Sequence, residues 1–310
     1  MNVPAPGNVD AILEDSKETL AQKVFDWVEE SEGWFWVGDI DKELGIVTPQ
    51  QKGNRRQIVH NLYKTGKLHK DRNRQGRYKK SVIIHPMMWW DAPIEPLELA
   101  LPFGLSDQDR NLNVKIFNGN MIICAADSNS GKTIIAYNFA EDNIDTNPFK
   151  NKINLVVSEQ DASEVRYVLE NCPKYRPELW REKVTIRQKR GEWADMIVLD
   201  AINIFDYVTD YSEAWGIGEQ LRDVYDALYG AKGVIWCNLQ KDSDRDTGRG
   251  GSVTKDLARL YLSITQYTNN SVVKIVKAKF PGGVNPSGFR KKFRVTDEGE
   301  LVELGIWQRD

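Results

Sequence analysis

The residues best suited to carry out chemistry lie between Met121 and Ala140, in the stretch MIICAADSNSGKTIIAYNFA. An apolar run over 121–126 predicts a strand, a short polar loop follows it, and a helix is expected to open at Gly131-Lys132-Thr133. The loop fits the pattern (Ala or Gly)-x-x-x-x-Gly-Lys-(Ser or Thr), with Ala126 at its first position. Small residues let successive backbone N–H groups close on a polyphosphate, and a helix N-terminus adds unpaired donors and partial positive charge. This order of residues therefore predicts a phosphate-binding loop.

The same pattern assigns roles at a nucleoside triphosphate site, with ATP and Mg²⁺ as the expected ligands. Lys132 is expected to reach the β- and γ-phosphates, and the Thr133 hydroxyl is expected to ligate Mg²⁺. A polar turn that binds nothing is the alternative, but such a turn seldom combines this pattern with a preceding strand and a following helix. The residues predicted to form the nucleotide site are Ala126, Asp127, Ser128, Asn129, Ser130, Gly131, Lys132 and Thr133.

Two carboxylates that follow apolar runs would complete this site. The run MIVLD, residues 196–200, predicts a strand that ends in Asp200, where an acid is expected to hold Mg²⁺ together with Thr133. Glu159 follows the predicted strand 153–158, where a carboxylate can orient and deprotonate the attacking water. Two alternatives stay open: Glu159 caps the helix that follows it, or Asp161 is the base instead.

An amide and a glycine-rich loop follow the next predicted strand, which begins at residue 233. Gln240 ends this strand, where its amide can sense the γ-phosphate and relay its presence to the loop. The loop 241–255, KDSDRDTGRGGSVTK, is expected to be mobile and carries Arg245 and Arg249. An ordinary surface loop is the alternative.

Lys277 and Lys279 alternate with apolar residues near the end of the chain. The strand period of two places both lysines on one face. Two neighbouring cations repel each other, so the pair suits a polyanion that lies opposite. The alternative is a solvated strand face, where such lysines protect an edge against aggregation.

Apolar strands alternate with helical segments from residue 120 onward, which predicts an α/β fold with a mostly parallel sheet and helices on its faces. The strands are expected at 121–126, 153–158, 196–200 and 233–238. The runs 260–264, 271–280, FRKKFRV and LVELG, with turn signals between them, predict antiparallel strands at the end of the chain.

Composition and charge limit the class of protein. The 310 residues contain no apolar run near 18 residues, and the N-terminus has neither a basic nor an apolar signal region, so no membrane span and a cytoplasmic location are expected. Three cysteines without metal or disulfide spacing are expected to be buried thiols. Residues 50–80 contain eleven Lys or Arg against one acid, a net charge of +10, whereas the preceding 49 residues carry −8. This asymmetry indicates a localised contact with a polyanion.

The basic stretch belongs to a predicted small domain at residues 16–83, after a mobile tail at 1–15 and before a linker at 84–103. Helical spacing begins at Thr19, an aromatic strand is expected at 34–37, and a second helix at 40–44. Thr48-Pro49-Gln50-Gln51 predicts the start of a third helix, which ends near Gly66. A basic hairpin is expected to turn near Arg74-Gln75-Gly76.

This order resembles a winged helix-turn-helix, and the resemblance implies a recognition helix at 49–65 and a wing in the hairpin. DNA would then be contacted by the helix and the wing. A small domain with a solvated basic face, or one that docks to protein, is the alternative. The residues implied as DNA contacts are Lys52, Arg55, Arg56, Arg72, Arg74, Arg77, Lys79 and Lys80.

The remaining chain is predicted as one domain at 104–310, and roughly Leu101 to Gly305 resembles the RecA/DnaB-type ATPase core. Glu159, the acid at 200, Gln240 and the glycine-rich loop carry the resemblance, and KIVKAKFPGG is similar to a strand of the RepA-like hexameric helicases. The family implies a homo-oligomer, a hexameric ring or a filament, with ATP between subunits and DNA touched by Arg245 and Arg249. Lys277 and Lys279 would project into the neighbour's ATP site. Lys279 stands where many relatives place an arginine, and lysine is a point charge rather than a bidentate fork.

These features together predict a DNA-dependent ATPase of a plasmid or phage type in replication or recombination. It would bind DNA through the winged helix and couple ATP hydrolysis to translocation, loading or remodelling, as a helicase does. Two alternatives stay open: a RecA-like recombination filament, and an ATP-gated regulator that binds one operator.

Overall fold

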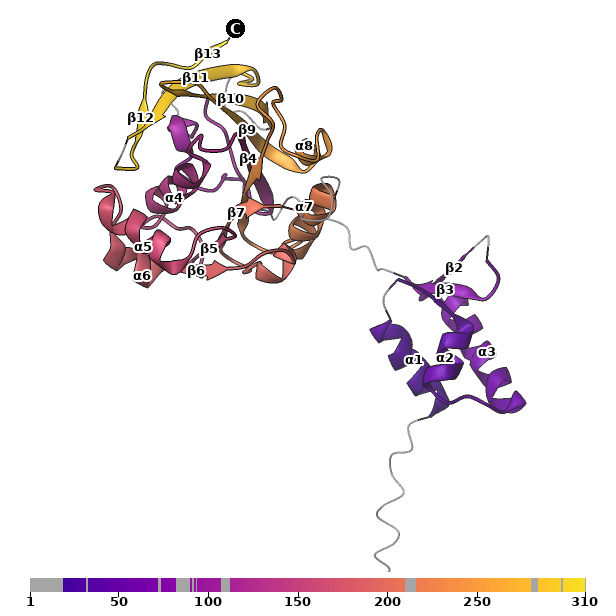
Figure 1. Ribbon diagram of the computed structural model, residues 1–310. Coiled ribbons are helices and arrows are strands. Elements are labelled where there is room, and N and C mark those ends of the chain that lie inside the picture. The colour runs from indigo at the N-terminus through magenta and orange to yellow at the C-terminus, as the bar shows by residue number, and fades with distance from the viewer. Residues whose placement is uncertain are drawn as a thin grey trace, which may run out of the picture. The chain divides into compact units, whose positions relative to one another are not determined.

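The computed structural model describes residues 19–31, 33–71, 74–81, 90, 92, 94–106, 112–209, 216–279, 284–296 and 298–309. The chain divides into two compact units, Met1–Ala92 and Pro93–Asp310 (Figure 1). The predicted tail at 1–15 and most of the first half of the predicted linker lie outside the described residues.

The described residues of the N-terminal unit form three helices and a small antiparallel sheet, in the order that the sequence predicts. Strand β3 lies between β1 and β2 in this sheet. Helix α3 begins as expected, because the Thr48 hydroxyl accepts a hydrogen bond from the Gln51 N–H at 3.2 Å and the Gln51 side-chain oxygen accepts one from the Thr48 N–H at 3.1 Å. The elements are α1 (Leu20–Glu30), β1 (Trp34–Trp36), α2 (Val37–Glu43), α3 (Pro49–Lys64), β2 (Leu68–Lys70) and β3 (Arg77–Lys80).

The second unit is built on one sheet, in which ten strands are found among the described residues. The order is β12-β11-β10-β9-β4-β8-β7-β5-β6, with β13 paired to β11. The pairs from β6 to β9 are parallel and the later pairs are antiparallel, as the sequence predicts. The strands are β4 (Asn120–Ala126), β5 (Ile153–Val157), β6 (Val184–Gln188), β7 (Ile202–Val208), β8 (Val234–Gln240), β9 (Ala258–Gln266), β10 (Ser271–Ala278), β11 (Phe289–Val295), β12 (Leu301–Glu303) and β13 (Gln308–Arg309).

Helices cover both faces of this sheet (Figure 1). One face packs against α4 (Lys132–Asp142), α5 (Ala162–Asn171) and α6 (Pro177–Lys183). The other packs against α7 (Gly216–Ala227), and α8 (Val253–Asp256) lies beside α7. In the central strand β4, Ile122 and Cys124 face the first layer while Met121 and Ile123 face the second. A strand buried on both faces is expected to be a nearly continuous apolar run, and β4 is apolar from Met121 to Ala126.

The second unit begins earlier than predicted. Leu99, Leu101 and Phe103 were expected to belong to the linker, but they are buried in the main core. The Phe103 ring lies 4.9 Å from the Phe293 ring, and its carbonyl accepts a hydrogen bond from Trp307 at 3.2 Å. The end of the predicted linker is therefore part of the second unit.

The prediction of a strand at 196–200 is wrong. Met196 ends a 3₁₀ turn, and the strand that enters the sheet is β7, residues 202–208. The Asn203 side chain accepts a hydrogen bond from the Val198 N–H at 2.8 Å and donates one to the Val198 carbonyl at 2.9 Å. These bonds satisfy Val198 without a strand partner, so the apolar run MIVLD crosses the end of the sheet as irregular chain.

No helix among the described residues has both the length and the apolar composition needed to cross a bilayer.

Candidate functional site: a phosphate-loop cleft

A cleft of about 570 Å³ opens at the carboxyl ends of the parallel strands. This is where ligands bind in open α/β sheets, because loops that follow neighbouring strands meet there. The phosphate loop and Glu159 both line this cleft, so they lie close together as the sequence predicts. The described lining residues are Asn129 to Ile134, Glu159, Gln266 to Ser271, Arg294 and Val295.

The phosphate loop has the backbone that its glycine and small polar residues allow. Gly131 has a φ of 93°, and a Cβ at this position would lie 2.7 Å from a Val295 methyl group, so only glycine fits. Ser130 donates its hydroxyl to the Asp127 carbonyl at 2.7 Å, which closes the turn. Ala126 and Asp127 are buried behind the loop, and the exposed Ser128 lines a neighbouring pocket with Gln240. Of the predicted nucleotide contacts, Asn129 to Thr133 line the cleft.

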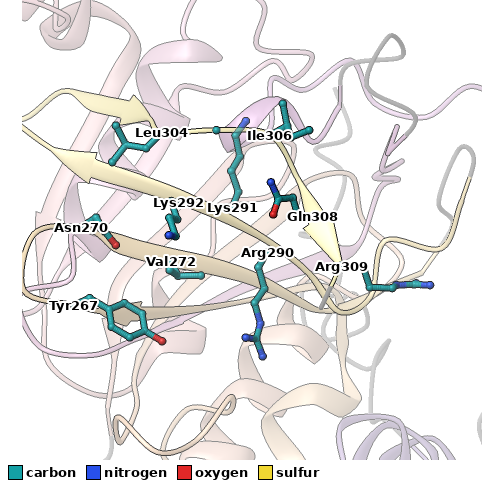
Figure 2. A pocket seen from close by; sticks show the side chains of 11 residues that line it. Tyr267, Asn270, Val272, Arg290, Lys291, Lys292, Leu304, Ile306, Gln308 and Arg309 are labelled. Carbon is teal, nitrogen blue, oxygen red and sulfur yellow. The ribbon is translucent and has the colours of Figure 1, made fainter.

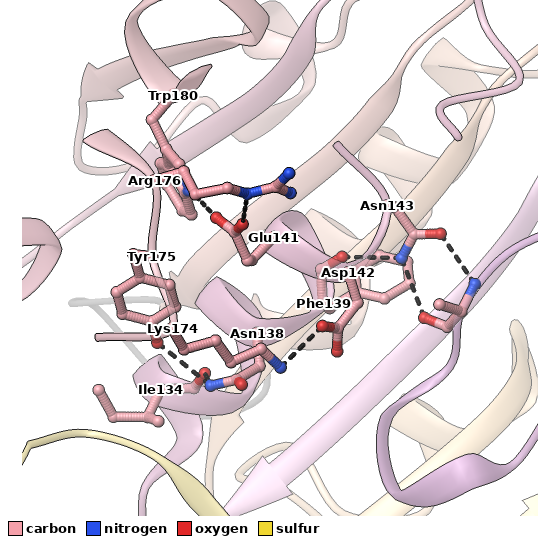
Figure 3. Close-up of polar contacts among 11 residues, drawn as sticks. Ile134, Asn138, Phe139, Glu141, Asp142, Asn143, Lys174, Tyr175, Arg176 and Trp180 are labelled. Atoms are coloured by element: carbon pink, nitrogen blue, oxygen red, sulfur yellow. Dashed lines mark hydrogen bonds and ion pairs between the residues drawn. The ribbon is translucent and has the colours of Figure 1, made fainter. Parts of the chain in front are cut away.

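Polar contacts fix α4, the helix that carries Lys132 and Thr133 at its N-terminus (Figure 3). Near its C-terminus the buried Glu141 carboxylate accepts hydrogen bonds from the Trp180 indole and the Arg176 guanidinium, both at 2.5 Å. Asn143 donates to the Ala100 carbonyl at 2.9 Å and accepts from the Ala100 N–H at 2.8 Å. Anchoring at the far end keeps the N-terminal turn and its backbone donors in place.

The carboxylate beside Thr133 is Asp206, which sequence reasoning missed. Asp206 lies near the carboxyl end of β7, and its side chain accepts hydrogen bonds from Thr133 and, at 2.8 Å, from Asn238. Asn238 on β8 also donates to the Lys132 carbonyl at 2.9 Å. One buried amide thus connects the first residue of α4 with the acid.

Asp200, predicted to hold Mg²⁺, lies at the opposite end of the sheet. Its N–H donates to the Lys232 carbonyl at 2.7 Å, and its own carbonyl accepts from the Asn151 N–H at 3.0 Å. Lys232 and Asn151 precede β8 and β5, whereas the phosphate loop follows β4. The assignment of Asp200 is therefore wrong, for the same reason as the strand: the chain enters the sheet six residues later than the run 196–200 predicts. The signal that could have found Asp206 is the second apolar run, INIFDYV, with an acid inside it.

Burial determines the electrostatics of Asp206. The side chain is removed from solvent, and this burial raises its pKa above the ordinary value, with the Glu159 charge adding to the rise. Hydrogen bonds from Asn238 and Thr133 and the charge of Lys132 lower the pKa and favour the carboxylate. An acid with hydroxyl and cationic neighbours in a phosphate cleft suits a Mg²⁺–phosphate ligand, because the ion supplies the missing positive charge.

Glu159 lies across the cleft from Lys132, with Tyr207 between them. Its carboxylate accepts a hydrogen bond from the Tyr207 hydroxyl at 2.9 Å, and the Lys132 ammonium lies 4.6 Å from the centre of the Tyr207 ring. Asp161, the reserve candidate, instead caps α5, accepting from the Ser163 and Glu164 N–H groups at 2.8 and 2.9 Å. The cap is thus Asp161, which leaves Glu159 on the cleft wall.

Gln240 joins β8 to the phosphate loop. Its amide donates to the Ser128 hydroxyl at 2.9 Å, and its carbonyl accepts from the Arg249 N–H at 2.8 Å. The loop that follows packs against β8 and β9: the Gly248 N–H donates to the Tyr261 hydroxyl of β9 at 2.8 Å, and a Cβ on Gly248 would lie 2.8 Å from Leu239 of β8. Its Arg245 and Arg249 side chains are exposed.

Lys241, which sequence reasoning did not select, ties this loop to the nucleotide site. Its ammonium is buried and lies 3.0 Å from the Asp127 carboxylate of the phosphate loop. It also donates to the Arg245 carbonyl at 3.0 Å and to the Thr265 hydroxyl at 3.1 Å. A movement of Asp127 would therefore be transmitted to Arg245 through a single side chain.

Lys277 and Lys279 lie away from this cleft. Lys277 is paired with Tyr261, which lies level with Ile123 in the middle of β4, and the Lys279 N–H donates to the Arg259 carbonyl near the start of β9, toward the end of the sheet opposite the phosphate loop. A bulge at Val276 interrupts the expected alternation, and the Lys277 ammonium donates to the Lys255 and Asp256 carbonyls at the end of α8. Burial, and next the Lys279 charge, lower the pKa of Lys277. Lys279 is exposed, whereas Lys277 is partly buried and bonded to backbone carbonyls.

The N-terminal unit requires one correction to the implied DNA contacts. Arg55 is buried, only 5% exposed, and forms a two-point ion pair with Asp41 of α2, with N–O distances of 2.9 and 2.5 Å. It therefore fixes α3 against α2 and is not available to a ligand. Lys52 and Arg56 remain exposed on α3.

The hairpin cations are partly engaged within the unit. Arg77 lies 3.4 Å from the Asp71 carboxylate, and Lys80 lies 3.5 Å from Glu29 of α1. Lys79 lies over the Trp34 ring, with its ammonium 5.2 Å from the ring centre. Arg74 at the turn is exposed, and Arg72 lies outside the described residues.

A second pocket, of about 590 Å³, lies on the antiparallel part of the sheet (Figure 2). It is lined by the cations Arg290, Lys292 and Arg309, and by Tyr267 and Asn270 of the turn between β9 and β10. Tyr267 and Asn270 also line the phosphate-loop cleft. This turn is therefore a wall that the two pockets share.

Comparison with known proteins supports the fold. Neither a protein-family model nor a curated protein matches the sequence. Among solved structures, a KaiC-like protein from the hyperthermophilic archaeon Pyrococcus horikoshii OT3 matches with a TM-score of 0.52 and 14% identity. The match covers 69% of this chain and all of that protein. The second unit thus has the RecA-like phosphate-loop fold that the sequence predicts.

Proposed function

We propose that this chain is a Mg²⁺-dependent ATPase that acts on DNA. The observation that carries the proposal is that Lys132, Thr133 and Glu159 line one cleft, while the buried Asp206 of β7 accepts a hydrogen bond from Thr133. The loop N–H groups and Lys132 would bind the phosphates, and Thr133 and Asp206 would hold Mg²⁺. Bound Mg²⁺ would neutralise charge on the phosphates and polarise the γ-phosphoryl group.

Glu159 would act as the general base. It lies on the cleft wall at the end of β5, where its carboxylate can accept a proton from the attacking water. The hydrogen bond from Tyr207 would orient this carboxylate, and Gln240 would report the state of the loop through Ser128.

DNA is the partner proposed for the N-terminal unit and for the 241–255 loop. Lys52 and Arg56 lie exposed on a capped helix, and the element order of residues 20–80 supports a winged helix-turn-helix. Arg245 and Arg249 would contact a single strand. Hydrolysis would be coupled to movement, loading or remodelling on DNA.

A homo-oligomer, a ring or a filament, completes the proposal. Lys279 is exposed at the end of the sheet opposite its own cleft, so a role in hydrolysis requires a neighbouring subunit's γ-phosphate. Lys279→Ala protein mixed with Lys132→Ala protein should recover activity, since a mixed interface pairs an intact loop with an intact lysine. The absence of recovery, with subunit exchange confirmed, would remove the trans role.

The experiment that tests the function measures ATP turnover with single-stranded DNA, duplex DNA and no DNA, beside the particle mass with and without ATP. We expect turnover that Lys132→Ala abolishes and DNA accelerates, in an ATP-dependent assembly. Turnover that DNA leaves unchanged would reduce the proposal to an ATPase, and normal turnover in Lys132→Ala would refute the site. If the protein instead coats single-stranded DNA as a filament, a role in recombination is favoured. If it binds one duplex site and hydrolyses ATP slowly, a regulatory role is favoured.

A further inference from the structure

Two tryptophans of the N-terminal unit point to solvent from the outer face of its small sheet. Trp34 and Trp36 are 40% and 45% exposed, whereas Phe35 between them is buried in the unit's core. The strand period of two explains this division, since alternate side chains point to opposite faces. Exposing two indoles forgoes the stabilisation that their burial would supply, and neighbouring large exposed side chains indicate a binding surface.

Cations on the adjacent strand lie against the same two indoles. Trp34 is opposite Lys79 and Trp36 is opposite Arg77 in the β1–β3 register. The Arg77 guanidinium lies 5.3 Å from the Trp34 ring centre and 6.0 Å from the Trp36 ring centre, and the Lys79 ammonium lies 5.2 Å from Trp34. These are cation–π distances. The outer face, formed by Trp34, Trp36, Arg77 and Lys79, is a cationic aromatic platform.

We propose that this platform binds single-stranded DNA by stacking unpaired bases on Trp34 and Trp36, with Arg77 and Lys79 near the phosphates. Stacking on aromatic side chains beside a basic groove is how proteins bind single strands with little sequence preference. The two indoles are two residues apart on one strand, about 6.7 Å, which is twice the ~3.4 Å step of a duplex strand. Successive bases must therefore be unstacked to reach both rings, and paired bases in a duplex cannot do so.

The charge of the platform favours a nucleic acid over an apolar protein partner. Arg77 lies 3.4 Å from the Asp71 carboxylate, and the Lys79 ammonium lies over the Trp34 indole. A hydrophobic partner would have to desolvate both cations without replacing their hydration, which is costly. A polyanion with exposed π-faces satisfies the charges and the rings together.

The inference rests on the proposed function for its class of ligand, and the test separates the two. The affinity of the full chain for a labelled oligothymidylate and for a duplex would be measured by anisotropy, with no nucleotide present. Trp34→Leu/Trp36→Leu keeps apolar bulk but removes the rings, and Trp34→Phe/Trp36→Phe keeps aromatic faces. Tyr229→Leu, which alters an 82% exposed side chain of the second unit, is the matched control.

The leucine pair should weaken oligothymidylate binding about tenfold or more, the phenylalanine pair much less, and the control not at all. The ratio of wild-type to leucine-pair affinity should remain about tenfold at raised salt, because stacking releases no counterions. Wild-type affinity in the leucine pair, equal losses in both pairs, or an equal loss for duplex would each overturn the inference. A chain that shows no ATP turnover but this pattern of binding would refute the proposed function alone.

Discussion

The two units place their functional side chains differently along the chain. In the N-terminal unit, the cations of helix α3 and the following hairpin lie within one stretch of 31 residues, which carries a net charge of +10. In the second unit, the contact between Asn238 and Lys132 joins residues 106 positions apart. The charge-rich stretch of the first unit is therefore visible in the sequence, whereas the cleft of the second unit forms only when its strands are arranged side by side in the sheet.

The same difference affects what each set of charges can do. Asp41 and Glu29 come from the acidic first part of the chain and pair with Arg55 and Lys80. Part of the basic excess is thus used inside the N-terminal unit. In the second unit the buried Asp206 accepts hydrogen bonds from Asn238 and from Thr133, and Thr133 lines the cleft. The charge of a stretch of sequence thus predicts that its ligand is a polyanion, but the contacts within the folded unit determine which of its side chains are free to reach that ligand.

The largest expected effect tests the acid that tertiary structure, and not local sequence, places beside Thr133. Asp206→Asn should lower ATP turnover by a factor of about 10²–10³, the scale of losing one electrostatic contact in an active site. Asp200→Asn is the control, because that residue lies at the other end of the sheet, and its turnover should stay within about twofold. Steady-state ATPase assays at saturating Mg²⁺ would measure both. The reverse order of effects would restore Asp200 as the ligand.

The next effect concerns the two acids that follow β5. Glu159→Gln should bind ATP but hydrolyse it about a hundredfold more slowly, as expected when a general base is lost. Asp161→Asn removes a charged cap and keeps a good capping residue, so turnover and melting temperature should change little. Nucleotide affinity and single-turnover rates separate binding from chemistry. A slow Asp161→Asn with a normal Glu159→Gln would show that the base is Asp161.

A comparison of neighbouring arginines tests the N-terminal unit. Arg55→Ala leaves Asp41 without its partner and should destabilise this unit by about 3 kcal/mol, as for other partly buried pairs. Lys52→Glu/Arg56→Glu should instead keep the melting temperature and lower duplex affinity about tenfold, with a smaller salt dependence. Thermal melts and duplex titrations at two salt concentrations distinguish these results. Duplex affinity unchanged in the double variant would favour a protein-docking role.

The smallest expected effect concerns the connection between loop and nucleotide site. Lys241→Met removes the ammonium between Asp127 and Arg245, and should lower the ratio of DNA-stimulated to basal turnover about fivefold, within the usual range of coupling energies. Lys274→Met is the control, since Lys274 pairs with Asp246 of the same loop but does not contact the phosphate loop. If both variants lowered this turnover ratio equally, the coupling would depend on how well the 241–255 loop is held in place, and not on Lys241 itself.

Several features of the fold could be predicted because they are local. The phosphate loop, the Thr48 cap and the order of elements in the N-terminal unit depend on residues within a few positions of one another. The start of the second unit near Leu99 could not be predicted in this way, because its burial depends on a core completed by Phe293 and Trp307. Arg55 was predicted as exposed because a helix alone does not show which charged side chain meets a partner on α2.

The sequence by itself determined that a polyphosphate loop stands between a buried strand and a helix, since this requires only small residues, a lysine and a threonine at fixed spacing. Tertiary structure alone decided which acid accompanies it. The runs MIVLD and INIFDYV are both apolar and both contain an aspartate, so local pattern does not distinguish them. The side chains of Asn154 and Asn203 bind the backbone of 196–198, which leaves β7 to enter the sheet and places Asp206 beside Thr133.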